Sequence, residues 1–329
     1  MKGTLRAKIT GVGAFLPEKI VTNKDLESII ETSDEWIKTR TGIEERRIVD
    51  DKTSCSDLGS EAAQRALKMA GITSGEVELI IVATITPDMS WPATACIIQE
   101  KIGAHNAAAF DISAGCTGFI YGLAAATQFI QGGMYQKVLV IGSEVLSRIV
   151  NWQDRTSCIL FGDGAGAVVL EATNGPSGIL ANYLGSDGQG AHLLKQPAGG
   201  TCMPASFKTV EEKLHTIHMN GNEVFKFAVR VMGDASLKVL EMLGISKDEI
   251  DLLIPHQANM RIVEAALKRL NLPPEKVIVN LNKFGNMSSA SIPVALNHAI
   301  EEKRLHQGQK VLMVGFGAGL TWGATLMEW

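Results

Sequence analysis

The sequence repeats itself at a spacing of 173 residues, and this repeat restricts the possible folds more than any other feature of the chain. Residues 67–81, which begin Leu-Lys-Met-Ala-Gly-Ile, resemble residues 240–254, which begin Leu-Glu-Met-Leu-Gly-Ile. Lys137-Val-Leu-Val-Ile-Gly142 resembles Lys310-Val-Leu-Met-Val-Gly315 at the same spacing. Two separate matches at one spacing indicate a duplicated unit. We therefore expect two related halves, residues 1–173 and 174–329.

Each half shows the same alternation of amphipathic helical patterns and short apolar runs. The first helix of each half ends at a glycine, Gly71 or Gly244, a residue type that commonly stops helices. Apolar strands that alternate with helices predict mainly parallel strands in sheets covered on both faces. Two such sheets would share a layer of helices; a single large doubly wound sheet is the alternative. The expected helices cover about 56–70, 117–132, 226–243 and 288–303, and the expected strands cover 79–83, 137–142, 252–255 and 310–315.

Composition excludes several classes of protein. Apolar residues make up 46% of the chain and the net charge is −4, which fits a globular protein and rules out a globally basic nucleic-acid binder. The N-terminus lacks the apolar segment of a signal peptide, and no apolar run approaches the ~20 residues of a membrane span. The five cysteines form no C-x-x-C pair, so neither a zinc site nor a disulfide framework is indicated. We expect a cytoplasmic protein without metal, nucleic-acid or membrane binding.

Cys116 lies in a run of small residues, Asp111-Ile-Ser-Ala-Gly-Cys-Thr-Gly118, between a short strand pattern and a helical pattern. We expect it at the helix N-terminus, where unpaired N–H groups and the helix dipole favour a thiolate and can lower a cysteine pKa to roughly 3.5–7.5. The flanking glycines leave room for a substrate carbonyl group. The alternative interpretation is a small buried cysteine with a packing role.

His256 follows a predicted strand in the run Leu252-Leu-Ile-Pro-His-Gln-Ala-Asn259. Open α/β sheets bind ligands at the carboxyl ends of their strands, so this histidine is a candidate catalytic residue. The alternative is a structural histidine. His215 and His218 have the spacing of metal ligands but lack a carboxylate pattern beside them, so we expect a surface loop there.

The third candidate is the run Gly285-Asn-Met-Ser-Ser-Ala-Ser291. Asn286 and Ser289 lie 173 residues beyond positions 113 and 116, so this loop is the second-half counterpart of the Cys116 turn. If a pseudo-twofold axis relates the halves, both turns face one cleft. The duplication therefore supports Cys116, His256 and Asn286 as one catalytic group.

Two glycine clusters, Gly162-Asp-Gly-Ala-Gly166 and Gly315-Phe-Gly-Ala-Gly319, superficially match a dinucleotide-binding loop. That loop must open a helix after a strand. Here strand patterns follow instead, at 167–171 and 324–328. We expect tight β-turns near the active site, and no nucleotide cofactor.

Taken together, these runs resemble the thiolase superfamily of condensing enzymes, and within it the β-ketoacyl-acyl-carrier-protein synthase III family. The resemblance spans essentially the whole chain and includes Phe161-Gly-Asp-Gly-Ala-Gly166 and Asn222-Glu-Val-Phe-Lys226. A thiolase would have a second cysteine near the C-terminus, and an elongating synthase would have a second histidine where Asn286 stands. The resemblance implies a thiolase-like five-layered αβαβα fold, a homodimer, and no cofactor, with acyl-CoA as a substrate.

The resemblance also implies a reaction. A short acyl-CoA acylates Cys116, malonyl-acyl-carrier-protein loses CO2, and its enolate attacks the acyl-cysteine to start fatty-acid synthesis. His256 and Asn286 would donate to the enolate oxygen, and N–H groups of Cys116 and Gly319 would form the oxyanion hole. Trp91 would close the acyl pocket of the neighbouring subunit. The residues implied for CoA and its pantetheine arm are Trp36, Arg40, Arg155, Leu160, Phe161, Met219, Asn222, Phe225, Ala258, Asn259 and Phe316.

A basic face beside the active site is the expected dock for the acidic acyl carrier protein. The run 258–270 has a helical pattern directly after His256, with Arg261 and Lys268 on one face. Complementary charge would speed encounter and set the register of the complex. A solvated helix face is the plain alternative. The expected docking residues are Gln257, Arg261, Lys226, Lys268 and Arg269.

Other functions remain open from the sequence alone. One is a related condensing enzyme of a secondary-metabolite pathway that accepts CoA-bound malonate. Others are a non-catalytic acyl-binding paralogue and a cysteine hydrolase built on the Cys116 turn. The complete set of Cys116, His256 and Asn286 argues against the paralogue, and the duplication argues against the hydrolase.

Overall fold

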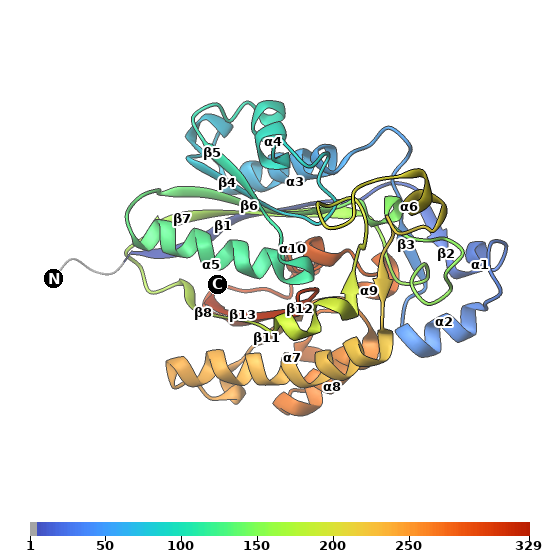
Figure 1. Cartoon of the computed structure of the whole chain (residues 1–329). Helices are drawn as coiled ribbons and strands as arrows, with labels where there is room; N and C mark the ends of the chain where they lie inside the picture. The colour runs from blue at the N-terminus through green and yellow to red at the C-terminus, as the bar shows by residue number, and fades with distance from the viewer. Residues whose placement is uncertain (1–4) are drawn as a thin grey trace.

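Two mixed β-sheets enclose a central layer of helices and carry further helices on their outer faces, which gives the molecule five layers (Figure 1). The computed structural model describes residues 5–329. The first sheet contains, in spatial order, β1 (Arg6–Phe15), β7 (Gly164–Thr173), β6 (Lys137–Glu144), β4 (Leu79–Ala83) and β5 (Ala108–Ile112). The second contains β11 (Leu252–Pro255), β12 (Lys310–Gly317), β13 (Thr321–Glu328) and β8 (Gly178–Ser186).

Three pairs of helices make the other layers. α3 (Cys55–Ala70) and α4 (Thr94–Ile102) cover the outer face of the first sheet. α5 (Gly118–Gln131) and α10 (Ser291–Glu301) lie between the sheets, and α7 (Gly221–Leu243) covers the second sheet with α8 (Met260–Leu270) beside it. In Figure 1 the layers run from α3 and α4 at the top to α7 and α8 at the bottom. Within residues 5–329, no helix has both the length and the apolar character needed to cross a membrane.

Short elements form a cap, residues 20–47, at the right of Figure 1. Near the cap lies α9, and β3 packs against it. A second small strand pair and α6 follow β8 in the chain. The bounds are β2 (Ile20–Thr22), β3 (Glu45–Arg47), α1 (Asn23–Leu26), α2 (Asp34–Thr41), α9 (Leu281–Phe284), β9 (Leu194–Lys195), β10 (His218–Met219) and α6 (Phe207–Glu211).

The two sheets that share a helical layer confirm the predicted fold class, but the prediction of mainly parallel strands is wrong. In the described chain, parallel pairs of the two sheets join β4 to β5 and β6, and β11 to β12. The pairs of β7 with β1 and β6, and of β13 with β12 and β8, are antiparallel. The glycine cluster at 315–319 explains part of this, because β12 returns as β13 through a tight turn without a crossover helix.

The central layer supplies much of the core. Phe119, Ile120 and Leu123 of α5 and Ile292 and Leu296 of α10 are fully buried. Burial of such a side chain stabilises the fold by about 1.5–3 kcal/mol. Because α5 is apolar on most of its circumference, it is stable only between two sheets. This burial fixes the position of its N-terminus, where Cys116 lies.

The glycine that ends α3 gives a stability prediction. Gly71 has φ of +70°, and nothing lies within 4 Å of a β-carbon added there. Gly71→Ala should lower the free energy of unfolding by about 1 kcal/mol, because a β-carbon strains a left-handed residue. Denaturant titration measures this. Gly75→Ala is the matched control, since that glycine is equally open but has no positive φ. Equal losses in the two variants would contradict the explanation.

Candidate active site

Cys116 lies at the junction of the first sheet and the central layer. It belongs to the single turn η2 (Gly115–Thr117), which precedes α5, so it has the expected position at a helix N-terminus. Gly317 of β12 packs directly on this turn, because a β-carbon at Gly317 would lie 2.5 Å from the Cys116 nitrogen. The hydroxyls of Thr117 and Thr321, 2.7 Å apart, tie the turn to β13.

The Cys116 thiol does not have the low pKa that its helix position suggested. Burial raises the pKa of this thiol to about 12; the nearby Ser288 hydroxyl opposes the rise, and the buried carboxyl of Glu144 adds to it. Loss of hydration outweighs the favourable field of the helix terminus, since a thiolate needs solvation that this site lacks. The unliganded protein therefore holds a neutral thiol.

His256 follows β11 and is held on several sides. Its backbone N–H donates to Val314 O at 2.7 Å, and its Nδ1 lies 2.6 Å from the Ser291 hydroxyl. The Phe316 ring packs edge-on at 5.4 Å between centroids. Burial lowers the pKa of His256 to about 3, so its ring is neutral at pH 7. Within residues 5–329, its buried Nε2 has no hydrogen-bond partner, which is a feature typical of a ligand site.

Asn286 begins a segment that we call the Asn286 loop, residues 286–291. Its N–H donates to Leu160 O at 2.8 Å, and its carbonyl accepts from the Gly162 N–H at 3.0 Å. Its side-chain Oδ1 accepts from the Ser288 N–H at 2.9 Å. Because the oxygen is engaged, the Nδ2 amide group is the part available to a ligand.

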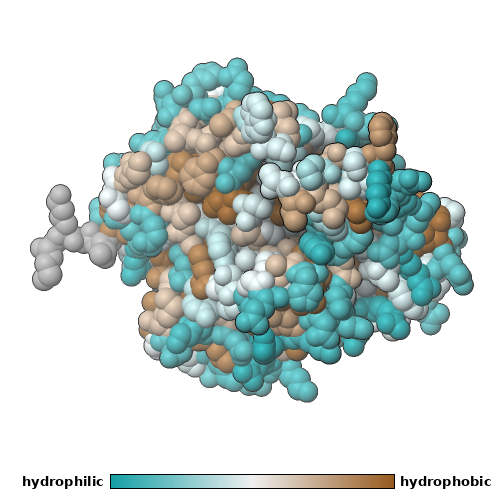
Figure 2. Space-filling model, in the orientation of Figure 1, coloured by the Kyte–Doolittle hydropathy of each residue, from teal (hydrophilic) through white to brown (hydrophobic). Residues whose placement is uncertain are grey.

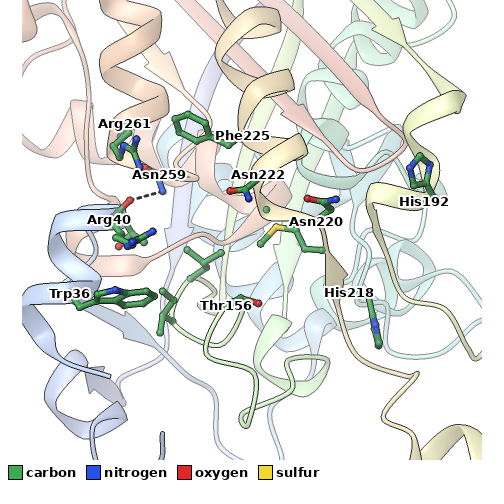
Figure 3. Close-up of a pocket in the computed structure, with 15 residues that line it drawn as sticks. Trp36, Arg40, Thr156, His192, His218, Asn220, Asn222, Phe225, Asn259 and Arg261 are labelled. Atoms are coloured by element: carbon green, nitrogen blue, oxygen red, sulfur yellow. Dashed lines mark hydrogen bonds between the residues drawn. The ribbon is translucent and has the colours of Figure 1, made fainter. Parts of the chain in front are cut away.

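The structure brings Cys116, His256 and Asn286 together at one cavity of about 100 Å³. A larger surface pocket of about 840 Å³ shares part of its lining with this cavity. A continuous path therefore leads from the surface to Cys116, and its outer part is drawn in Figure 3. The residues common to both are Leu160, Met219, Gly221, Phe225 and Asn259. Among the expected pantetheine residues, Phe161, Ala258 and Phe316 line the inner cavity and Asn222 lines the outer pocket.

Trp36 and Arg40 form one wall of the outer pocket, and Arg155 packs on the Trp36 ring. The guanidinium of Arg155 lies 4.7 Å from the Trp36 ring centroid and that of Arg40 lies 5.1 Å from it, distances typical of cation–π contacts. Arg155 lines an additional surface pocket with residues 29–31. Asn259 caps α8, and its Nδ2 donates to Arg40 O at 3.0 Å, which ties α8 to the cap (Figure 3).

Two predicted site residues lie elsewhere. Gln257 is fully buried, donates to Pro255 O and Ile278 O, and accepts from the Asn280 N–H. It joins backbone segments and cannot contact a carrier protein, so its assignment to docking is wrong. Gly319 does not line the cavity, whereas Gly317 does, and a β-carbon at Gly115 would lie 2.9 Å from the Ala318 nitrogen. The Ala318 nitrogen thus lies beside the Cys116 turn.

The other expected docking residues are on the surface, but two of them are paired. Lys226 lies 2.8 Å from Glu223, and Arg269 lies 2.9 Å from Asp234. The Arg261 guanidinium packs over the Phe225 ring at 5.0 Å and lines the outer pocket. Lys268 is exposed and forms no ion pair within the described chain. Trp91 is 83% exposed, so no contact of this single chain closes an acyl pocket with it.

Sequence reasoning missed two serines of the Asn286 loop. Ser291 lies against His256, and Ser288 orients the Asn286 amide through its backbone N–H. The run Ser-Ser-Ala-Ser gave a weak signal, because three hydroxyls in one buried turn need partners. His192 and His218 also line the outer pocket; neither was predicted as a site residue, and His218 was noted only for its spacing from His215.

The arrangement suits thioester chemistry. A thiol can take up an acyl group, and two neutral N–H donors facing the same cavity can stabilise an enolate oxygen. Among residues 5–329, no cluster of three or more His, Cys, Asp or Glu side chains is arranged to hold a metal ion. Together with the two-sheet fold, this chemistry places the chain among the thiolase-fold condensing enzymes, which are acyltransferases.

Comparison with known proteins narrows this class to one family. Residues 110–188 match the model of 3-oxoacyl-[acyl-carrier-protein (ACP)] synthase III, and residues 240–329 match the model of its C-terminal part. The β-ketoacyl-[acyl-carrier-protein] synthase III of Caldanaerobacter subterraneus subsp. tengcongensis is 57% identical over 99% of this chain and 98% of its own. The chain belongs to the β-ketoacyl-[acyl-carrier-protein] synthase III family.

Solved structures agree. The 3-oxoacyl-[acyl-carrier-protein] synthase III of Aquifex aeolicus superposes with a TM-score of 0.92 at 47% identity, over 98% of this chain and 100% of the other. A priming β-ketosynthase from the R1128 polyketide biosynthetic pathway superposes with a TM-score of 0.91 at 34% identity, over 98% and 96%. The same fold therefore serves a 3-oxoacyl-[acyl-carrier-protein] synthase III and a priming β-ketosynthase of a polyketide pathway.

The raised pKa of Cys116 predicts how its alkylation depends on pH. Only the thiolate reacts, and its fraction rises about tenfold per pH unit below the pKa. Alkylation of Cys116 by iodoacetamide in the unliganded protein should therefore keep rising between about pH 7 and pH 10. Peptide mass mapping measures the rate at Cys116, with exposed Cys202 as an internal standard for the reagent. A plateau below about pH 8 would show a stabilised thiolate instead.

Proposed function

We propose that the chain catalyses the condensation of a short acyl-CoA with malonyl-acyl-carrier-protein, giving 3-oxoacyl-acyl-carrier-protein, CoA and CO2. This reaction initiates fatty-acid synthesis. The observation that carries the proposal is the cavity that holds Cys116, His256 and Asn286 at the end of a path from the surface. Both substrates occur in the cytoplasm, so we assign the enzyme to that compartment.

In the first step Cys116 takes up the acyl group. Its sulfur attacks the thioester carbonyl, the carbon–sulfur bond to CoA breaks, and the thiol proton leaves with CoA. Charge develops on the carbonyl oxygen, and we assign the N–H groups of Cys116 and Ala318 to stabilise it. The Trp36–Arg40–Arg155 wall offers an aromatic face and two cations, which suit the adenine and phosphates of CoA.

In the second step a malonyl thioester enters by the same path and loses CO2. The electron pair of the broken carbon–carbon bond becomes an enolate, whose carbon attacks the acyl-cysteine. The Cys116 sulfur leaves as a thiolate and takes up a proton from solvent, which restores the neutral thiol. If Ser291 donates to Nδ1 of His256, the ring proton is on Nε2, where it can donate to the enolate oxygen together with Asn286 Nδ2. Both donors are neutral, so they stabilise the enolate without protonating it first.

A second copy of the chain completes the proposed assembly. β5 is the edge strand of the first sheet, and no strand of residues 5–329 pairs with its outer side, which leaves that side able to pair with another chain. Apolar residues gather around β5 and α5 on the face shown in Figure 2, and Phe110, Ile112 and Phe129 are only partly buried there. These features support a homodimer. In it, Trp91, which is exposed in the single chain, would close the partner's acyl pocket.

The proposed reaction predicts separate effects on its two steps. Asn286→Ala should still form acyl-Cys116 with acetyl-CoA, because the thiol and its N–H donors are intact. Decarboxylation of malonyl-carrier-protein should fall about a hundredfold, the usual cost of losing one donor to a developing oxyanion. Peptide mass mapping measures the first step and CO2 release measures the second.

Loss of both steps to the same extent in Asn286→Ala would refute this division of roles.

The same two assays on the wild-type enzyme test the proposed function itself. If malonyl-CoA replaced malonyl-carrier-protein without loss of rate, the enzyme would belong to a secondary-metabolite pathway. A panel of acetyl-, isobutyryl- and longer acyl-CoA starters defines the preferred first substrate.

Docking of the carrier protein is tested best at Lys268. Arg261 lines the outer pocket, so reversing its charge would also disturb CoA, whereas Lys268 is exposed on α8 and does not line that pocket. Lys268→Glu should lower kcat/KM for malonyl-carrier-protein about tenfold at low salt, since rim charges act mainly on association. Acylation by acyl-CoA should stay at the wild-type rate.

Lys68→Glu is the matched control, because it makes the same charge change on α3, across the molecule on the outer face of the first sheet. It should leave both half-reactions unchanged. If both charge reversals lowered kcat/KM equally, the carrier protein would respond to the net charge of the enzyme and not to a dock on α8. The assignment of the dock to α8 would then be wrong.

A further inference from the structure

Glu144, the last residue of β6, is a fully buried carboxyl group that the proposed reaction does not use. No ion pair within residues 5–329 reaches it. Its Oε2 accepts from the Thr86 hydroxyl at 2.7 Å and from the Ile85 N–H at 3.1 Å. Its Oε1 lies 2.8 Å from the Ser289 hydroxyl. A charge buried without a cation is costly, so the state of this carboxyl needs an explanation.

Counting protons at Ser289 gives that explanation. The Ser289 hydroxyl lies 2.7 Å from Ala83 O and 2.8 Å from Glu144 Oε1, yet it has one proton to donate. Ala83 O can only accept, so the Ser289 proton belongs to that bond. The Ser289 N–H also reaches Oε1, but at 3.4 Å, so the short contact between the Ser289 hydroxyl and Oε1 is a hydrogen bond only if the carboxyl donates. Oε1 therefore holds a proton, and Oε2 is the oxygen that accepts from Thr86 and Ile85.

Ser289 belongs to the loop that touches every candidate catalytic group. Asn286 begins the loop, Ser288 lies near Cys116, and Ser291 contacts His256 Nδ1. A β-carbon at Gly142 would lie 2.4 Å from Ser289 O, so the loop is pressed against β6 at this point. A hydrogen bond from Glu144 to Ser289 thus holds the middle of the Asn286 loop. This loop carries Asn286 and contacts His256 through Ser291, so it positions both proposed enolate donors.

We propose that Glu144 is a positioning residue that works as a neutral carboxylic acid, donating from Oε1 to Ser289 and thereby fixing the Asn286 loop beside Cys116. The inference rests on the proposed function of that site. It requires a group that donates on one side and accepts on the other, and a carboxylic acid or a primary amide meets this requirement, whereas a carboxylate does not.

The neighbourhood of Glu144 keeps the proton in place. Burial raises the pKa of this carboxyl, and the titratable side chains that face it are the thiols of Cys116 and Cys55, with Asp88 beyond Cys55. None supplies positive charge. As pH rises through the raised pKa, Glu144 loses its proton, the bond to Ser289 Oγ is lost, and a negative charge appears near the enolate. Decarboxylation should therefore decline at alkaline pH in the wild type.

The experiment combines infrared spectroscopy with the two half-reactions. The difference spectrum of wild type minus Glu144→Gln at pH 7 should contain the C=O band of a protonated carboxyl group. Glu144→Gln should keep decarboxylation within about threefold, because an amide repeats the same donor and acceptor, and should lose the alkaline decline. Glu144→Leu and Ser289→Ala should each lose about tenfold or more, since buried partners are left unsatisfied.

Asp163→Asn is the matched control. Asp163 is also fully buried, but its two oxygens accept from the backbone N–H groups of Val49 and Ser147, so an amide there must oppose a donor. It should lower the thermal stability, whereas Glu144→Gln should not. A missing carboxyl band, equal damage from Gln and Leu at position 144, or an alkaline decline that persists in Glu144→Gln would overturn the proposal. The infrared and stability results do not depend on turnover, so they stand even if the condensation assay fails.

Discussion

The active site depends on backbone packing that only glycine permits. Gly317 lets the end of β12 touch the Cys116 turn, and Gly142 lets β6 touch the Asn286 loop. In each case a β-carbon would lie within 2.5 Å of a backbone atom of the opposite segment. These contacts bring a turn from each half of the chain to the seam between the two sheets. A side chain at either position would push the two segments apart. It would thereby separate the Cys116 thiol from His256 and Asn286, although those residues themselves are unchanged.

Close packing also sets the electrostatics of the site. Burial raises the pKa of the Cys116 thiol and of the Glu144 carboxyl and lowers the pKa of the His256 ring. Cys116 and His256 are therefore neutral at pH 7, and a neutral Glu144 is the state proposed above. A site of neutral dipoles holds no counter-ion that a substrate must displace. Its dipoles give most stabilisation when the substrate develops a charge within the site. The enolate left by decarboxylation is such a charge.

Much of the fold was predictable because its signals are local. The strands at 79–83 and 252–255 and the helix ends at Gly71 and Gly244 follow from apolar runs and glycine caps, and the structure confirms them. The antiparallel pairs were missed because strand direction depends on connections, which short patterns do not describe. Gln257 was misassigned for a similar reason. Its neighbours in sequence resemble a surface helix start, but its hydrogen-bond partners at 278 and 280 lie on a different segment.

One buried cation joins the mouth of the path to Cys116 with its inner end. Arg46 is fully buried, and burial lowers its pKa to about 10, so it stays charged at pH 7. It donates to Val21 O and Asn23 Oδ1 within the cap and to Ile159 O at 2.7 Å. Ile159 precedes Leu160, whose carbonyl accepts from the Asn286 N–H.

The cap carries Trp36 and Arg40, which belong to the proposed CoA wall, and Arg46 bonds the cap to Ile159. The proposed enolate donor Asn286 is bonded to the next residue, Leu160. The CoA wall and the enolate donor are therefore both attached to residues 159–160. Among residues 5–329, the groups that bond Arg46 are backbone carbonyls and one amide oxygen, and none is a carboxylate. Such bonds are directional and lose their value when the geometry shifts, whereas an ion pair tolerates displacement. A displaced cap would therefore leave a buried charge unsatisfied, and that penalty keeps the two ends of the path in register.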